Sequence, residues 1–364
     1  MIIPVLVILV VIIDVAIFWK LTYAFRLLRM RQHVLPNEDE LPSVTVCIPA
    51  RNEIHAMTSC LDRVVASDYP KLEIIVLDDE SRDETSILIK SYASSGVRFV
   101  EGKPLPEGWL GRNYAQNILA HEASGSVVFF MDVDTQIRVQ TISRVMAYML
   151  GERSDMVSII PRREDAWRAT VVFSTLRHFW TVVRFRGRRP RAASNAWFIK
   201  RDVLLERLEK DETLPISVQL ETTIARALVS QDKYRLVLSD TQLGLSYEKK
   251  WRSQLETSIR LLYPQCNKHW YAALGLAGIL GLTLLPYVLL PAMPLMALPT
   301  IVLQYVVAWY YLAHVWSRYS WIGALFYPLI VLQELVLVLV SMWRYNFGVI
   351  TWKGRPITTS KTPH

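Results

Sequence analysis

The first 21 residues, MIIPVLVILVVIIDVAIFWKL, form an apolar stretch about as long as a helix needs to cross a bilayer. The stretch lacks a basic n-region and an A-x-A cleavage signal, which favours an uncleaved anchor over a signal peptide. Basic residues follow at once, and the positive-inside rule then places the next domain in the cytoplasm: Lys20, Arg26, Arg29 and Arg31. Asp14 inside the stretch could be functional, but a packing or interfacial role is favoured.

Three further apolar stretches lie in the C-terminal third, at about 271–293, 295–316 and 321–342. They predict a multi-pass protein of the cell membrane whose membrane region covers 271–343. One anchor plus three crossings would put the tail, 344–364, outside, but its basic residues favour the cytoplasm. One stretch could therefore be re-entrant or interfacial, and the sequence leaves this open.

Composition adds three constraints to this membrane pattern. The hydrophobic content of 52% is high for a soluble protein, in agreement with membrane segments. Lys and Arg number 41 against 33 Asp and Glu, and the net charge of +8 indicates an anionic partner. Cys47, Cys60 and Cys266 form no CxxC pair and are interpreted as packed free thiols in a reducing compartment.

The segment from about 42 to 265 alternates apolar strands with amphipathic helices. Strands are expected at SVTVCIPA, EIIVLDD, VRFVEG, VVFFMDVD and DMVSIIP, with helices at about 53–67, 83–93, 112–123 and 139–150. Near-continuous apolar strands separated by helices predict an α/β fold with a parallel sheet covered on both faces. In such sheets ligands bind beyond the carboxyl ends of the strands.

Polar residues gather where three of these strands end. The first strand is followed by Pro49, Arg51, Asn52 and Glu53, the second by Asp78, Asp79, Ser81 and Asp83, and the fourth by Asp132 and Asp134. A single acidic strand end is usually a helix cap or a turn. Three ends that bring carboxylates, a hydroxyl and a guanidinium to one rim predict a binding site.

Close carboxylates oppose each other's ionisation, and a divalent cation resolves this conflict. Asp132 and Asp134 project the same way if the strand continues through Val133. Hard oxygen ligands suit Mg²⁺ or Mn²⁺, which keep open positions for phosphate oxygens. The sequence therefore predicts a metal diphosphate site.

Four motifs in this order resemble a membrane-anchored family 2 glycosyltransferase with the GT-A fold: PARNE at 49–53, LDDESRDET at 77–85, LPEGWLGRNYA at 105–115 and MDVDT at 131–135. The GWLGRN segment and TWKGRP at 351–356 are similar to the branch with hopanoid-associated, carotenoid and ceramide glucosyltransferases. The resemblance implies a Rossmann-like, mainly parallel mixed sheet over 42–248.

The resemblance also implies roles for single residues. Pro49, Arg51 and Glu53 would line the nucleoside pocket, where Asp79 would contact the uracil or ribose and Ser81 would lie nearby. Asp132 would face the ribose or the sugar, Asp134 would ligate the metal, and Arg112 would contact a phosphate. The competing interpretation of the Arg112 segment is a turn that leads into a helix.

This chain departs from the family at the catalytic base. Where the family places an acid pair before an L-A-R helix, the chain reads LETTIARAL, so Glu221 is the expected base, with Asp211 and Glu212 as the fallback. YEKKW replaces the Q-x-x-R-W element of processive synthases, which weakens a prediction of polymer synthesis. SNAWFIKR replaces the usual small-Gly-Gln step, so acceptor handling could also differ.

Aromatic and basic residues alternate over 162–191, which predicts an amphipathic helix in a membrane interface, and the same pattern recurs over 249–265. On the longer helix Thr170, Ser174, Arg177, His178, Thr181 and Arg184 would form a polar stripe. Nucleic acid is the competing partner, but tethering to a bilayer argues against it. The expected acceptor is therefore a membrane lipid.

The leading prediction is an inverting transferase that moves a sugar from a nucleotide sugar, in particular a UDP-sugar, to a lipid hydroxyl. A processive polysaccharide or polyprenyl-phosphate sugar transferase remains an alternative, as does a non-catalytic sugar-nucleotide or lipid-binding membrane protein. Trp352, Lys353 and Arg355 could fold back onto the active site or serve as a basic juxtamembrane anchor.

Overall fold

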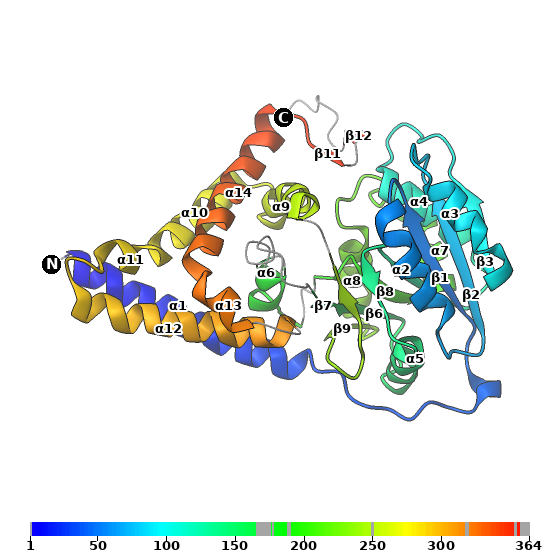
Figure 1. Ribbon diagram of the computed structural model, residues 1–364, viewed down its shortest axis with the longest axis horizontal. Coiled ribbons are helices and arrows are strands. Elements are labelled where there is room, and N and C mark those ends of the chain that lie inside the picture. Colours follow the sequence, from blue (N-terminus) through cyan, green and yellow to red (C-terminus); the bar gives the residue numbers. More distant parts are fainter. Residues whose placement is uncertain are drawn as a thin grey trace. The chain divides into compact units, whose positions relative to one another are not determined.

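The computed structural model describes residues 2–164, 176, 178–187, 191–248, 251–316, 320–352 and 355–356. The chain divides into two compact units (Figure 1). The sheet unit comprises Leu27–Arg163 and Phe185–Glu248, and the helical unit comprises Met1–Arg26, Glu164–Arg184 and Lys249–His364. Each unit is described by itself below.

A seven-stranded sheet forms the centre of the sheet unit, in the order β3-β2-β1-β4-β8-β6-β9. Its strands are β1 (Val44–Ala50), β2 (Leu72–Asp78), β3 (Val97–Glu101), β4 (Val127–Met131), β6 (Met156–Ile160), β8 (Ala196–Lys200) and β9 (Tyr234–Leu238). Only β8 runs antiparallel to its neighbours, β4 and β6, within this sheet. The mixed, mainly parallel α/β sheet predicted from the sequence is confirmed.

Helices cover both faces of this sheet, as the apolar runs predicted. They are α2 (Ile54–Val65), α3 (Thr85–Ser91), α4 (Gly111–Glu122), α5 (Thr141–Gly151), α7 (Arg201–Lys210) and α8 (Leu220–Val229). Alternate strand residues point to opposite faces, so Val46 and Phe129 join the core under α2 and α5. On the other face the Cys47 thiol donates to the Leu119 carbonyl of α4, at 3.8 Å.

A second, three-stranded sheet lies beside the end of β4. Its strands are β5 (Thr135–Gln136), β10 (Ser246–Tyr247) and β7 (Arg162–Arg163), in the order β5-β10-β7. Tyr247 pairs with Thr135 on one side and with Arg163 on the other. The residues that follow the DVD motif are thereby fixed by regular backbone pairing.

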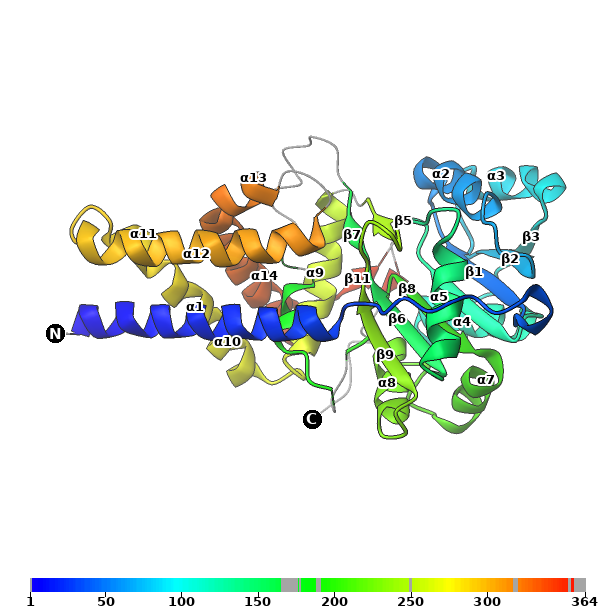
Figure 2. The ribbon, with the colours of Figure 1, turned by 90° about the horizontal axis from the view of Figure 1, so that it is seen from below.

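The segment that follows the first helix is part of the sheet unit (Figure 2). The Leu238 N–H donates to the Leu28 carbonyl at 2.8 Å, and Met30 and Leu35 pack against the hydrophobic core. A short 3₁₀ helix, η1 (Glu38–Glu40), then leads into β1, and another, η2 (Ala93–Ser95), follows α3. The sheet unit thus begins at Leu27, whereas the sequence led us to expect a domain that begins at residue 42. The earlier segment belongs to the unit because its apolar side chains pack against the hydrophobic core.

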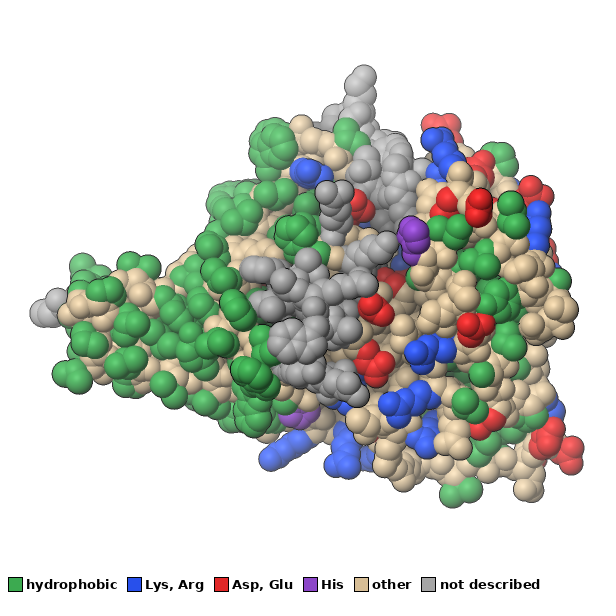
Figure 3. All heavy atoms as spheres, viewed as in Figure 1, with side chains coloured by type: hydrophobic (Ala, Val, Ile, Leu, Met, Phe, Trp, Pro, Cys, Tyr) green, Lys and Arg blue, Asp and Glu red, His purple; other side chains and the backbone are tan. Residues whose placement is uncertain are grey.

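The helical unit contains α1 (Ile2–Leu27, whose last residue opens the sheet unit), α6 (Phe179–Val183), α9 (Trp251–Gln265), α10 (Trp270–Thr283), α11 (Leu285–Leu289), α12 (Pro294–Val315), α13 (Ser320–Leu325) and α14 (Tyr327–Phe347). Four helical segments are long and apolar enough to cross a membrane: Ile2–Leu27, Trp270–Leu289, Pro294–Val315 and Tyr327–Phe347. Hydrophobic side chains cover much of the apolar helices on the face shown in the space-filling view (Figure 3). Ile12, Val302 and Trp309 are among the large hydrophobic side chains that are exposed.

The single amphipathic helix expected over 162–191 is not what the described residues form. Arg162 and Arg163 belong to β7, the only α-helix described there is α6, and the chain turns at Arg184. All five residues of α6 are buried, and the Trp180 indole donates to the Glu334 carboxylate of α14 at 3.1 Å. Bonding to α14 gives this aromatic segment a protein partner. Of the expected polar stripe, Thr170, Ser174 and Arg177 lie outside the described residues.

The C-terminal end carries a two-stranded antiparallel ribbon, β11 (Thr351–Trp352) and β12 (Arg355–Pro356). Lys353 lies outside the described residues, so the role proposed for this element rests on sequence alone.

Candidate active site

The strand order reverses between β1 and β4, and in open α/β sheets this switch point marks the ligand crevice. The two strands pair in parallel from Val44 with Val127 to Cys47 with Phe130. Pro49 lies beyond the last residue of β1 that pairs with β4. Because proline has no N–H, this position avoids the loss of a hydrogen bond to β4. The ends of β1, β2 and β4 therefore deliver their polar residues to one rim.

Arg51 connects the ends of β1 and β2. Its side chain is buried, and Nη1 donates to the Asp79 carbonyl at 2.5 Å while lying 3.8 Å from Asp79 Oδ2. Gly102, just beyond β3, lets the chains approach, because a Cβ there would lie 2.5 Å from the Asp78 carbonyl oxygen. Arg51 and Asp79 thus come together as the sequence predicted.

The turn after Arg51 is held by reciprocal bonds with the DDES segment. Asn52 adopts a left-handed conformation with φ 52°, its N–H donates to Ser81 Oγ at 2.9 Å, and its Oδ1 accepts from the Arg82 N–H at 2.8 Å. The Glu53 N–H donates to Thr85 Oγ1 at 2.9 Å. These bonds fix Ser81 and Glu53 relative to each other across two strand ends.

Asp83 stabilises the same segment through hydrogen bonds to Thr85. Its Oδ1 accepts from both the N–H and the hydroxyl of Thr85, at 3.1 and 2.5 Å. Burial alone would raise the pKa of Asp83, but the hydrogen bonds from Thr85 and from the backbone of Ile54 outweigh it and lower the pKa. Asp83 is therefore a structural anion that holds the loop.

The DVD motif is a turn and not the end of a strand, which corrects the prediction from alternation. β4 ends at Met131, and the Thr135 N–H donates to the Asp132 carbonyl at 2.9 Å across the turn. Val133 is buried at 4% exposure, whereas Asp132 and Asp134 are both part-exposed. The Asp132 N–H also donates to the carbonyl of Asn195, the residue before β8, at 3.0 Å, so the start of β8 helps to set the turn.

Arg112 lies at the centre of the acidic residues. Its Nη2 is 2.7 Å from Asp132 Oδ1 and donates to the Ser194 carbonyl at 2.5 Å. Burial by itself lowers the pKa of Arg112, but the carboxylates of Asp132, Glu221 and Asp134 outweigh burial and raise it. The guanidinium is thus a fixed cation that brings these three acids into one electrostatic cluster.

Glu221 lies in the first turn of α8 and is buried at 3% exposure. Besides acting on Arg112, its charge contributes to the raised pKa of Tyr234, for which burial is the larger cause. Asp211 instead accepts from Thr213 at 2.6 Å within an exposed loop, and Glu212 is exposed. Of the proposed bases, Glu221 is the one that the structure brings into the cluster around Arg112.

Asn113 has a structural role in the site that the sequence analysis missed. The side chain is buried, and its Nδ2 donates to the carbonyls of Leu214, Pro215 and Ser217 at 2.7, 3.1 and 2.8 Å. This loop leads directly into α8. Asn113 therefore fixes the approach to Glu221, and its place directly after Arg112 near a helix start was the available signal.

The carboxylates of the site fit a metal ion that is coordinated partly by the protein and partly by a bound ligand. No group of three or more His, Cys, Asp or Glu side chains in the described part of the chain could hold a metal ion. Asp132 Oδ1 is engaged by Arg112, which favours Asp134 as the carboxylate for a metal. Mg²⁺ and similar ions often take one or two protein carboxylates and fill their other positions with phosphate oxygens and water. The site fits such an ion and not an all-protein cage.

Residues 45–204 match the profile of glycosyl transferase family 2. A probable glycosyltransferase, YdaM, of Bacillus subtilis is 33% identical over 126 residues, which cover 33% of this chain and 30% of that protein. The undecaprenyl-phosphate 4-deoxy-4-formamido-L-arabinose transferase of Aeromonas hydrophila is 34% identical over 140 residues, 36% of this chain and 41% of that protein. The chain thus matches less than half the length of these relatives.

A solved structure, the mannosyltransferase PcManGT of Pyrobaculum calidifontis in complex with GDP-Man and Mn²⁺, superposes with a TM-score of 0.58. The superposition covers 94% of this chain and 99% of that one at 18% identity, a level that supports the fold alone. Residues 45–204 thus carry the match to glycosyl transferase family 2, the sheet unit has the GT-A fold, and the chain also carries apolar helices.

Proposed function

We propose that this protein is a metal-dependent, inverting glycosyltransferase that moves a sugar from a nucleotide sugar, in particular a UDP-sugar, to a hydroxyl of a membrane lipid. The observation that carries the proposal is the cluster around Arg112, whose charge interacts with Asp132, Asp134 and Glu221. These residues combine a diphosphate site with a candidate base.

The nucleoside half of the donor would lie at the ends of β1 and β2. Pro49, Arg51 and Glu53 would line its pocket, with Asp79 on the uracil or ribose and Ser81 beside it. The bonds from Arg51 to Asp79 and from Asn52 to Ser81 support this assignment, because they hold the pocket in shape before a ligand arrives.

Asp134 would hold Mg²⁺ or Mn²⁺ on the donor diphosphate, and Asp132 would orient the ribose or sugar. When bound, the ion neutralises charge on the leaving diphosphate. Arg112 keeps Asp132 in position through its 2.7 Å ion pair and adds positive charge beside the site. A direct phosphate contact by Arg112, expected from the sequence, would have to be made with the remaining N–H groups of its guanidinium.

Glu221 would act as the general base. Its carboxylate accepts the proton of the acceptor hydroxyl as that oxygen bonds to the anomeric carbon. The bond from this carbon to the diphosphate oxygen breaks at the same time, and the nucleoside diphosphate leaves with the electron pair. A single displacement inverts the configuration and needs no covalent enzyme intermediate.

The acceptor and the location are inferred from the apolar helices. Four candidate spans, with basic residues directly after the first, support a multi-pass protein of the cell membrane whose sheet unit is cytoplasmic. A catalytic domain anchored in this way meets acceptors in the lipid phase, so a lipid alcohol is favoured over a soluble sugar.

A polyprenyl phosphate is the second candidate acceptor, favoured by the name of the Aeromonas relative. A phosphate oxygen is already ionised near neutral pH and needs no general base. The two acceptors therefore differ in their need for Glu221. The hopanoid, carotenoid and ceramide branch stays a proposal that rests on the GWLGRN and TWKGRP motifs.

The proposal can be tested by incubating purified full-length protein with Mn²⁺, radiolabelled nucleotide sugars and membrane lipid extract. Label should enter the organic phase, and Asp134→Ala should lower the rate by about 10²–10³-fold, as the loss of a charge-stabilising group does in other enzymes. Transfer that survives Asp134→Ala would contradict the metal assignment. No transfer or hydrolysis with any donor would favour a non-catalytic binding protein.

A further inference from the structure

A cavity lies in the sheet unit, apart from the residues of the candidate active site. Its volume is about 700 Å³, and its walls come from the end of α2, the segment that enters α5 and the turn at 241–242. Its lining includes Asp62, Arg63, Arg138, Gln140, Arg144 and Gln242. None of them has a role in the proposed reaction.

Positive charge dominates this cavity. Arg63, Arg138 and Arg144 line it, and Asp62 is the one carboxylate among the lining residues. Asp62 accepts a hydrogen bond from the Tyr92 hydroxyl at 2.7 Å. Within the described residues, none of the three arginines lies within 4.0 Å of a carboxylate, so their charges are not neutralised by ion pairs.

Two of the arginines are held in place by neutral acceptors. Arg138 Nη1 donates to the Thr241 carbonyl at 2.8 Å, and Arg144 donates to the Gln242 carbonyl and, at 2.7 Å, to Gln140 Oε1. Carbonyl partners orient a guanidinium and leave its charge intact. Because each guanidinium has five N–H donors, others remain for a ligand.

The turn that supplies these carbonyls is itself fixed. Asp240 Oδ1 accepts from the N–H groups of Gln242 and Leu243 at 2.9 and 2.7 Å. Gly244 has φ +68°, and a Cβ there would lie 2.4 Å from Arg138 Cδ. The glycine is needed both for this backbone conformation and for the Arg138 side chain to cross the turn. The basic cavity is therefore built before a ligand binds.

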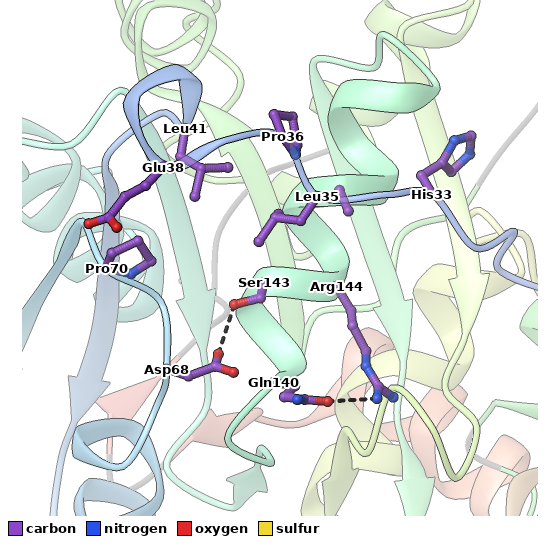
Figure 4. A pocket seen from close by; sticks show the side chains of 11 residues that line it. His33, Leu35, Pro36, Glu38, Leu41, Asp68, Pro70, Gln140, Ser143 and Arg144 are labelled. Carbon is purple, nitrogen blue, oxygen red and sulfur yellow. Dashed lines mark hydrogen bonds between the residues drawn. The ribbon is translucent and has the colours of Figure 1, made fainter.

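A smaller cavity of about 380 Å³ adjoins it and shares Gln140 and Arg144 (Figure 4). Its other wall is the segment after α1, including His33, Leu35 and Pro36. Arg144 thus lies between the basic cavity and the chain that leads to the first candidate membrane span.

Chain connectivity limits how far the basic cavity can lie from the end of α1. The Gln32 side chain donates to the Gln242 side chain, which lines the cavity. Gln32 follows Leu27, the last residue of α1, by five residues, and five extended residues reach at most about 18 Å. If α1 spans a bilayer, the cavity is within reach of lipid headgroups.

We propose that this basic cavity binds the phosphate of an anionic phospholipid headgroup in the membrane that holds α1. Three arginines without carboxylate partners match such a headgroup in charge, and their guanidinium geometry suits phosphate oxygens. The proposal rests on α1 lying in a bilayer and goes beyond the transferase proposal. It assigns the enzyme a second lipid contact, separate from the acceptor.

The test is lipid retention by the full-length protein. Delipidated protein in neutral detergent is mixed with equal amounts of phosphatidylglycerol and phosphatidylcholine, and bound lipids are counted by native mass spectrometry. Wild-type protein should retain phosphatidylglycerol preferentially. Each arginine near an anionic surface contributes about fivefold in affinity, so the triple variant Arg63→Gln, Arg138→Gln, Arg144→Gln should lose at least about tenfold of this preference.

A matched control removes three exposed cations elsewhere on the sheet unit, Lys90→Gln, Arg153→Gln and Arg226→Gln, and should keep the preference. The triple variant Arg63→Lys, Arg138→Lys, Arg144→Lys should keep most of the preference, because the charges remain. Should the triple Gln variant not fold, Arg63→Gln alone provides the test, because its side chain has no hydrogen-bond or ion-pair partner in the described structure.

Three results would overturn the proposal. Equal retention of both lipids by wild-type protein would show that it has no site selective for anionic lipid. An unchanged preference in the triple Gln variant would show that such a site lies outside the basic cavity. A separate arm adds millimolar inorganic phosphate, which should not displace the lipid. Complete displacement would show that the cavity takes free phosphate and contradict the headgroup assignment. None of these results depends on transferase activity.

Discussion

At the scale of single residues, the candidate active site depends on how charge is balanced around Arg112. Three carboxylates near one another repel each other, and the positive charge of the buried Arg112 guanidinium offsets that repulsion. The ion pair with Asp132 leaves two acids with separate proposed tasks, Asp134 for a cation and Glu221 for a proton. A change at any one of these four residues therefore alters the others.

Glu221→Gln provides the residue-scale test of the base. The amide keeps the size of the side chain but cannot accept the acceptor's proton, so kcat for a lipid alcohol should fall by about 10²–10⁴-fold. KM for the nucleotide sugar should change little, because the donor contacts are assigned elsewhere. Steady-state kinetics on the full-length protein gives both values.

Asp211→Asn is the matched control, because the Asp211 side chain bonds only to Thr213 of the same exposed loop in the described structure. Full activity in Glu221→Gln would contradict the base assignment and favour a phosphate acceptor.

At the scale of elements, one carboxylate joins three strands and a helix connection at the end of the sheet opposite the active site. Glu73 Oε2 accepts from Thr45 Oγ1 at 2.6 Å and from the N–H and hydroxyl of Ser124 at 2.9 and 2.8 Å, while Arg98 lies 3.4 Å from Oε1. Burial alone would raise the pKa of Glu73, but these hydrogen bonds and the Arg98 charge lower it below its ordinary value of 4.5.

The lowered pKa of Glu73 predicts a loss of stability in acid. Because the carboxylate is favoured in the folded state, its contribution is complete above the unfolded pKa, about 4.5, and is lost as the pH falls through the lower folded pKa. Glu73→Gln should lower the Tm at pH 7 and make it fall less steeply below about pH 4.5 than in wild type. Thermal unfolding at several pH values measures this. Glu101→Gln, at an exposed site, should leave the slope unchanged.

Side chains of α14 bond to backbone groups of α9 at the place where a proline interrupts the hydrogen bonds within α9. Pro264 has no N–H, so the Arg260 carbonyl loses its normal helical partner, and the Tyr345 hydroxyl donates to it instead at 2.7 Å. Ser341 Oγ accepts from the Tyr263 N–H at 3.0 Å and donates to the Ile259 carbonyl at 2.5 Å. Two side chains of α14 thus satisfy the groups that the proline region leaves open.

Tyr345→Phe should destabilise the helical unit by about 1–3 kcal/mol, because a carbonyl in a part-buried contact loses its partner. The same change in a Pro264→Ala background should cost less, since the alanine would supply the missing N–H. Thermal unfolding of wild type, the two single variants and the double variant completes this double-mutant cycle, with Tyr271→Phe as a control at an exposed site. Equal costs in both backgrounds would contradict the partnership.

At the scale of the whole molecule, the candidate spans and the basic residues after α1 make a prediction about topology. All three native cysteines are buried, so an introduced cysteine is a selective probe. With the sheet unit cytoplasmic, Glu209→Cys should react with a membrane-impermeant maleimide only after cells are lysed. Ala292→Cys, between the second and third spans, should react in intact cells. Labelling of both, or the reverse order, would contradict the proposed orientation.

Much of this architecture could be read from the sequence because its signals are local. Apolar runs and helical periodicity predicted β1 to β4 and β6 in their order along the chain, since strands buried on both faces of a parallel sheet need such runs. They did not predict β5, and they extended β4 beyond Met131. The order of PARNE and LDDES predicted that Arg51 and Asp79 come together, because the carboxyl ends of parallel strands share one rim. The apolar stretches likewise predicted the four candidate spans.

What only the tertiary structure decided depends on partners distant in sequence. The DVD turn is held by the carbonyl of Asn195, the residue before β8, and the Arg112 side chain is held by Asp132 and Ser194, both distant in the chain. The segment after α1 joins the sheet unit because Leu238 bonds to its backbone and its apolar side chains pack against the hydrophobic core. The basic cavity exists because the 241–242 turn meets α5. Periodicity fixes which residues are buried, but it cannot specify which groups from other elements they meet.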